Sequence, residues 1–221
     1  MNLDPPGIVC YEHCALGRLF AFTLPPNCDL CGADLEDAPL AQPPFRVPYP
    51  FVRASQVPCC IVIKPTRGDF LHDYRNNSNL HIGVTDSEGR VYEYDFEGLH
   101  SDGAASWIQC LAVPIISSNT NDTPDPVWKE YRENFYNCYT FVIKFLRALR
   151  PPSFCTKDLC KTSFCDAFIV PVTSSAAKYI SVYRSLRERE VLPVPRNNTI
   201  ILRKKEAQNI IRDNAITTSE L

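Results

Sequence analysis

The chain has 221 residues, of which 45% are hydrophobic and 22% are charged, and its formal net charge is -2. This composition is that of an ordinary globular protein, with material for one sizeable core or for a core plus a small module. The weak net charge excludes a global field that attracts nucleic acid, so we expect no nucleic-acid partner. No stretch approaches the roughly 18 consecutive apolar residues that a bilayer crossing needs, so we expect no membrane span.

The first residues lack the basic start and apolar run of a secretory signal, so we expect a cytoplasmic or nuclear protein. The chain contains eleven cysteines, an odd number. In a reducing compartment these cysteines are thiols or metal ligands rather than members of a disulfide framework.

The sequence divides into four predicted segments. Residues 1–45 are predicted to form a cysteine-rich module, and the Pro-rich residues 46–58 a linker, because proline resists both helix and central strand. Residues 59–195 are predicted to form the main α+β domain, and residues 196–221 an edge strand followed by a polar tail.

Strands precede helices along this chain. Apolar and β-branched runs predict strands at residues 18–24, 59–64, 80–85, 90–96, 107–116 and 199–202. The four residues Asp86 to Gly89 separate two of these runs and predict a β-hairpin. Capping residues and apolar stripes predict helices at residues 127–135, 137–149 and 174–189.

Five metal-binding side chains lie within the first 31 residues: Cys10, His13, Cys14, Cys28 and Cys31. Cys28 and Cys31 have the two-residue spacing and the trailing glycine of a zinc knuckle. Cys14 with either Cys10 or His13 would complete four ligands. The region therefore predicts a structural zinc site, and the alternative is a group of buried thiols.

A second constellation joins Cys138 to His81. Asn137 is a good helix cap, which would place Cys138 in the first turn, where free N–H groups and the helix dipole favour a thiolate. His81 lies on the first strand of the predicted hairpin. If its apolar neighbours Leu80 and Ile82 pack on the helix, strand alternation points His81 away from Cys138.

Two local strings resemble circularly permuted papain-like proteins, namely the PPPDE, LRAT-like and NlpC-like groups. The string Leu80 to Val84 resembles their histidine strand, and Asn137 to Phe141 resembles their nucleophile helix. The resemblance implies a permuted papain-like fold, an antiparallel sheet packed with helices. It also implies that Cys138 is the nucleophile and His81 the general base and then acid, in thioester or isopeptide cleavage or in acyl transfer.

The orienting third residue of such a site is not assigned by the sequence, which offers Glu93 or Asp95. Two hypotheses therefore stand. One is a thiol hydrolase or acyltransferase that acts on an acylated or isopeptide substrate. The other is a catalytically inactive papain-like scaffold that binds a protein partner, which the missing third residue favours.

Five further segments resemble the makorin opposite-strand protein family, whose activity is not established. They are residues 35–39, 65–71, 80–85, 137–139 and 177–184. This resemblance indicates a family, and it leaves the function to be decided from the residues.

Overall fold

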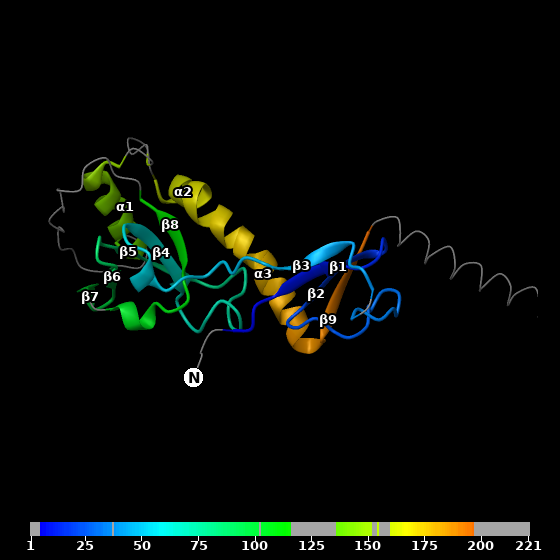
Figure 1. Cartoon of the computed structure of the whole chain (residues 1–221). Coiled ribbons are helices and arrows are strands. Elements are labelled where there is room, and N and C mark those ends of the chain that lie inside the picture. Colours follow the sequence, from blue (N-terminus) through cyan, green and yellow to red (C-terminus); the bar gives the residue numbers. More distant parts are fainter. Residues whose placement is uncertain are drawn as a thin grey trace, which may run out of the picture. The chain divides into compact units, whose positions relative to one another are not determined.

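The computed structural model describes residues 5–36, 38–101, 103–115, 136–151, 154 and 160–196 (Figure 1). The chain forms two compact units. Unit 1 combines Met1–Tyr49 with Val182–Leu221, and unit 2 is Pro50–Ser181. Each unit is built around an antiparallel sheet, so the fold class is α+β, as the sequence predicted.

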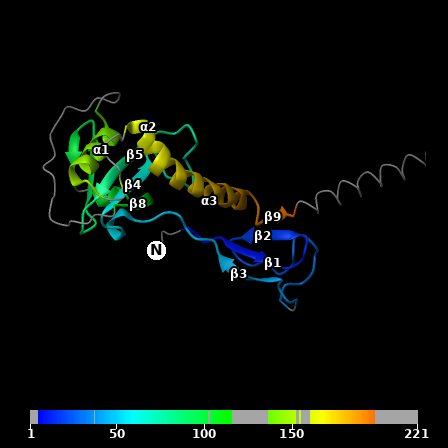
Figure 2. The ribbon, with the colours of Figure 1, turned by 90° about the horizontal axis from the view of Figure 1, so that it is seen from above.

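Unit 1 contains a four-stranded sheet in the order β3-β1-β2-β9 (Figure 2). Its strands are β1 (Val9–Glu12), β2 (Gly17–Ala21), β3 (Gln42–Arg46) and β9 (Val191–Pro195). The segment 191–195 was predicted to belong to the main domain, but it pairs antiparallel with β2 over five residues. The N-terminal module is therefore completed by a strand from the far end of the chain.

Both outer strands of this sheet contain proline, which explains why the sequence did not predict them. Pro43 and Pro44 lie in β3, and Pro193 and Pro195 lie in β9. Proline has no N–H to donate to a neighbouring strand, so it is accepted at a sheet edge and not at the centre. Strand β3 lies just before the predicted linker at 46–58 and shares only Arg46 with it, so an edge strand forms where the sequence predicted none.

The interior of unit 1 holds an apolar cluster and one buried acid. The cluster joins residues of β1, β2 and β9 to the segment 28–35: Tyr11, Leu19, Ala21, Cys28, Leu30, Leu35 and Val191. Glu12 is 7% exposed and forms ion pairs with Arg18 and Arg196. The N–H of Arg196 also donates to the carbonyl of Leu16 at 3.0 Å, so both contacts hold β9 against the β1–β2 hairpin.

Unit 2 contains a five-stranded sheet in the order β7-β6-β5-β4-β8. Its strands are β4 (Cys60–Pro65), β5 (Leu80–Thr85), β6 (Val91–Asp95), β7 (Gly98–His100) and β8 (Leu111–Pro114). The predicted hairpin is confirmed as β5–β6. The strand predicted at 107–116 is shorter than expected. Strand β8 begins only at Leu111, after a 3-10 turn at residues 103–106 (η2) and the fully buried Trp107.

Helices follow the sheet in the sequence. Helix α1 (Cys138–Leu149) confirms the predicted helix and contacts β5 and β6. A continuous helical stretch follows, made of α2 (Lys161–Phe164), a π-helical turn (Cys165–Ile169) and α3 (Val170–Glu188). It begins earlier than the predicted helix at 174–189.

Some expectations fall beyond the residues that the structure describes. These are the helix at 127–135 and the edge strand at 199–202. Within the described ranges, no helix has both the length and the apolar character that a bilayer crossing requires.

Candidate functional site

Cys138 is the first residue of α1 and follows the cap residue Asn137. The side chain of Asn137 accepts a hydrogen bond from the backbone N–H of Thr140 at 3.2 Å, so the helix begins where the sequence predicted. Cys138 is buried, with 6% of its surface exposed. Backbone N–H groups in a first helical turn have no partner within the helix, which makes this position favourable for a thiolate.

His81 lies near the start of β5 and its side chain is largely buried. Its Nε2–H donates to Oε2 of Glu93 at 2.7 Å. Burial alone would disfavour the charged ring, but hydrogen-bonding and charge interactions with Cys138 and Glu93 outweigh burial and raise the pKa of His81 to about 9. Cys138, in the first turn of α1, is thus one of the groups that raise the pKa of His81.

Glu93, on β6, is held by three other side chains. Besides His81, the indole N–H of Trp107 donates to Oε1 at 3.0 Å, and Lys64 Nζ lies 3.9 Å from Oε2. Lys64 also lies over the Trp107 ring, 4.3 Å from the ring centroid. Burial raises the pKa of Glu93, but the bonds from His81 and Trp107 and the charge of Lys64 lower it by more, so the carboxyl is ionised.

Of the two acids that the sequence offered as partners of His81, the structure pairs Glu93 with it. By the β5–β6 register, Asp95 would lie opposite His81, but pairing of these strands ends at Gly83 and Glu93. On its other edge β6 pairs with β7, and there Asp95 accepts a hydrogen bond from His100 Nε2 at 2.9 Å. The diagonal neighbour Glu93 therefore contacts His81.

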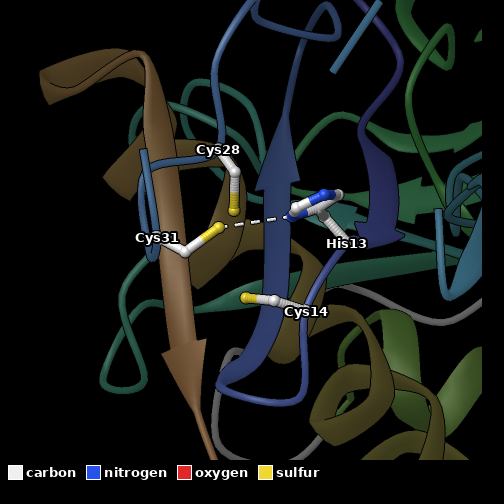
Figure 3. Close-up of side chains that lie close together, drawn as sticks. All are labelled: His13, Cys14, Cys28 and Cys31. Atoms are coloured by element: carbon white, nitrogen blue, oxygen red, sulfur yellow. Dashed lines mark hydrogen bonds between the residues drawn. The ribbon is translucent and has the colours of Figure 1, made fainter. Parts of the chain in front are cut away.

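A separate group of metal-binding side chains lies in unit 1. The group consists of His13, Cys14, Cys28 and Cys31. Each residue offers one ligand atom, and these four atoms all lie within 4.8 Å of one another. Figure 3 shows their side chains converging, with Cys31 Sγ 3.3 Å from His13 Nδ1. This group is able to hold a metal ion.

Two short turns bring these residues together. His13 and Cys14 follow β1 in the connection to β2, where the chain has left the strand and adjacent side chains are no longer forced to opposite sides. Cys28 and Cys31 lie in a tight turn in which the Gly32 N–H donates to the Cys28 carbonyl at 2.7 Å. Gly32 has φ +77, a left-handed conformation that glycine adopts without strain.

Cys10 is not part of this group, so of the two residues that the sequence left open beside Cys14 the group contains His13. Cys10 lies within β1, pairs with Phe20 of β2 and is 2% exposed. Burial raises the pKa of its thiol, so it is a core residue. His13 takes the fourth position instead, next to Cys14 in the chain.

The structure thus defines an α+β protein with a buried His81–Glu93 pair in one unit and a three-cysteine, one-histidine group in the other. The chain belongs to the DUF4796 family: its residues 44–186 match the family's C-terminal region and residues 6–35 its N-terminal region. It is similar to the MKRN2 opposite strand protein of Homo sapiens, with 29% identity over 196 residues, which cover 82% of this chain and 86% of the relative. The resemblance to the makorin opposite-strand family is therefore supported.

No solved structure matches the chain. The expected permuted papain-like architecture therefore has no support from known structures. Neither the family description nor the relative's name states an activity. The function has to be argued from the two sites.

Proposed function

We propose that this protein is a cysteine hydrolase or acyltransferase with Cys138 as nucleophile, His81 as general base and acid, and Glu93 as the residue that orients His81. The proposal rests on His81: its Nε2–H donates to Glu93 at 2.7 Å, and Cys138 is among the groups that raise its pKa. A nucleophile, a base within hydrogen-bonding reach and a group that orients the base are the parts that thiol catalysis requires.

Glu93 has two effects on the reaction. Since it occupies Nε2 of His81, Nδ1 is the ring nitrogen left for the thiol of Cys138. A buried carboxylate also favours the imidazolium, and an imidazolium beside Cys138 favours the thiolate. His81 is therefore charged near neutral pH and has a proton to give to a leaving group.

The proposed reaction begins when the thiolate attacks the carbonyl carbon of a thioester or isopeptide bond. A C–S bond forms, and the backbone N–H of Cys138 at the helix N-terminus donates to the oxyanion. His81 then protonates the leaving thiol or amine as its bond to carbon breaks. In the second half His81 takes a proton from water or from an acceptor, which attacks the acyl-enzyme and releases Cys138.

The finer fold assignment belongs to this proposal. A cysteine at the start of a helix that packs on an antiparallel sheet bearing the histidine is the arrangement that the papain-like resemblance implies. In this chain α1 packs on β5 and β6, and β5 carries His81. These contacts support a permuted papain-like unit 2.

A second function, a non-catalytic scaffold that binds a protein partner, is favoured by the burial of the nucleophile. Cys138 is 6% exposed, so a substrate carbonyl has little access to the sulfur as the chain stands. In this alternative the cluster of Cys138, His81 and Glu93 stabilises the core and Cys138 is inert.

Thiol labelling with iodoacetamide at about pH 6.5, followed by peptide mapping, separates the two functions. If Cys138 is a nucleophile, it should be labelled faster than the other cysteines outside the metal group, and His81→Ala should slow its labelling about tenfold. His100→Ala is the matched control, because His100 pairs with Asp95 and should leave Cys138 labelling unchanged. Equally slow labelling of Cys138 in all three proteins would leave only the scaffold.

We also propose that His13, Cys14, Cys28 and Cys31 hold one structural zinc ion. Three sulfur ligands and one imidazole suit Zn²⁺, and four protein ligands leave no position for a reacting water. Elemental analysis of protein purified under reducing conditions should give one zinc per chain. Cys28→Ser should lose the metal, whereas Cys10→Ser should retain it, since Cys10 lies outside the group.

A further inference from the structure

Tyr11 of β1 is fully buried in the core of unit 1. It is 0% exposed, and its hydroxyl has no hydrogen-bond partner among the described residues. A buried hydroxyl without a partner costs on the order of 1–3 kcal/mol, so such a group calls for a physical reason.

The surroundings of Tyr11 point to the metal group. Tyr11 belongs to the same packed cluster as Cys28, one of the four grouped ligands, and it precedes His13 by two residues. The phenolic hydroxyl of Tyr11 carries one hydrogen that it is able to donate.

Metal binding changes what Cys28 offers to that donor. A neutral thiol is a weak hydrogen-bond acceptor, whereas a metal-bound sulfur is a thiolate and carries negative charge. Hydrogen bonds to charged acceptors are about twice as strong as neutral ones. A hydroxyl without a partner in the free chain would gain one when a metal binds.

We propose that Tyr11 is a positioning residue of the metal site, and that its hydroxyl donates a hydrogen bond to the sulfur of Cys28 when a divalent ion is bound. This inference rests on the proposed zinc site. Tyr11, a buried residue of the sheet, would then contribute to the affinity for the ion together with the two ligand turns. Groups that hydrogen-bond to metal ligands typically contribute about 10- to 100-fold in affinity.

The experiment uses the full chain with Tyr11→Phe, which removes the hydroxyl and keeps the ring. Zinc affinity is measured by competition with a chromophoric chelator, and the absorption spectrum of the Co²⁺-substituted protein is recorded. Tyr11→Phe should bind zinc about 10- to 100-fold more weakly and shift the sulfur-to-cobalt charge-transfer band. The metal-free variant should be at least as stable as the metal-free wild type, because the unpaired hydroxyl is gone.

Tyr183→Phe is the matched control, since Tyr183 is also a buried tyrosine of unit 1, packed edge-on against Phe22 and outside the cluster of Tyr11 and Cys28. It should match the wild type in affinity and in spectrum. Unchanged zinc affinity and an unchanged cobalt spectrum in Tyr11→Phe would overturn the role of Tyr11 while the zinc site stands. A wild-type chain that binds neither zinc nor cobalt would overturn the zinc site itself.

Discussion

At the scale of single residues, Glu93 organises the polar interior of unit 2. Its two carboxylate oxygens accept hydrogen bonds from His81 and Trp107 and form an ion pair with Lys64. These three residues come from different segments of the chain. The ionised carboxylate of Glu93 stabilises the charged form of His81. The pKa of His81 is therefore raised, and the pKa of Glu93 is lowered. The stability of unit 2 should therefore fall at both alkaline and acidic pH.

The first prediction concerns Glu93→Gln. The pKa of folded His81 is raised from 6.5 to about 9, so its contribution to stability is fully present below pH 6.5 and is lost as the pH rises toward 9. The shift corresponds to on the order of 3 kcal/mol. The wild type should lose stability across this window in denaturant titrations, and Glu93→Gln should flatten the loss.

The folded Glu93 pKa is depressed, so its own contribution is present above its ordinary value of 4.5 and disappears as the pH falls through the folded value. Glu93→Gln should also remove this loss of stability at acidic pH. An NMR titration of the His81 ring checks the cause directly. A ring that still titrates near pH 9 in Glu93→Gln would show that Glu93 does not hold the charge.

At the scale of elements, the hairpin turn between β5 and β6 depends on one glycine. Asp86 Oδ1 accepts hydrogen bonds from the backbone N–H groups of Glu88 and Arg90, both at 2.9 Å. Gly89 has φ +79, and a Cβ at this position would lie 2.5 Å from the carbonyl oxygen of Ser55. Conformation and space therefore both require glycine here.

The second prediction compares Gly89→Ala with Gly32→Ala. Gly32 has nearly the same φ, +77, but a Cβ there meets nothing within 4 Å. Gly32→Ala should cost only the left-handed strain, roughly 1–2 kcal/mol, in its own unit. Gly89→Ala carries the same strain plus a backbone clash, so thermal unfolding of unit 2 should show a clearly larger loss. Equal losses would mean that the Ser55 contact can relax.

The third prediction concerns the start of α1. Asn137→Ala removes the cap bond to Thr140 N–H and should destabilise the protein by about 1 kcal/mol in denaturant titrations. Asn137→Asp keeps an acceptor oxygen at the same place and should restore most of that loss. If the aspartate variant were as unstable as the alanine variant, the cap bond would not be the source of the effect.

At the scale of the whole molecule, two units built from separate sheets should respond separately to loss of metal. Unit 1 takes its fourth strand, β9, from the end of the described chain, and the ligand turns belong to the same unit. Ligand turns that share a metal restrict the loops around β1 and β2, against which β9 pairs. Structural zinc contributes directly to the folding free energy of the unit that holds it.

The fourth prediction is that a chelator lowers the melting temperature of unit 1 and leaves unit 2 unchanged. Hydrogen exchange of residues 191–195 reports on unit 1, because these residues pair with β2. Fluorescence of the buried Trp107 reports on unit 2, in a Trp128→Phe background that removes the second tryptophan. Cys10→Ser, which keeps the ligand group, should remain sensitive to the chelator. Unchanged exchange at β9 after zinc removal would contradict the prediction.

The sequence by itself determined what depends on near neighbours. The β5–β6 hairpin follows from two apolar runs around a glycine turn, and α1 begins at Cys138 because Asn137 caps it. The Cys28–Cys31 turn is equally local, since it closes through Gly32. Turn chemistry and caps act over a few residues, so their signals are present in the sequence.

Only the tertiary structure decided what depends on partners from distant segments. Strand β9 exists because β2 offers an unpaired edge that accepts a proline-containing strand, and no local pattern indicates this. His13 rather than Cys10 joins the metal group because β1 ends between them. Glu93 rather than Asp95 contacts His81 because the pairing of β6 with β5 ends at Glu93. These choices are fixed by strand ends and strand partners, which are set by packing across the whole unit rather than by the residues next to the site.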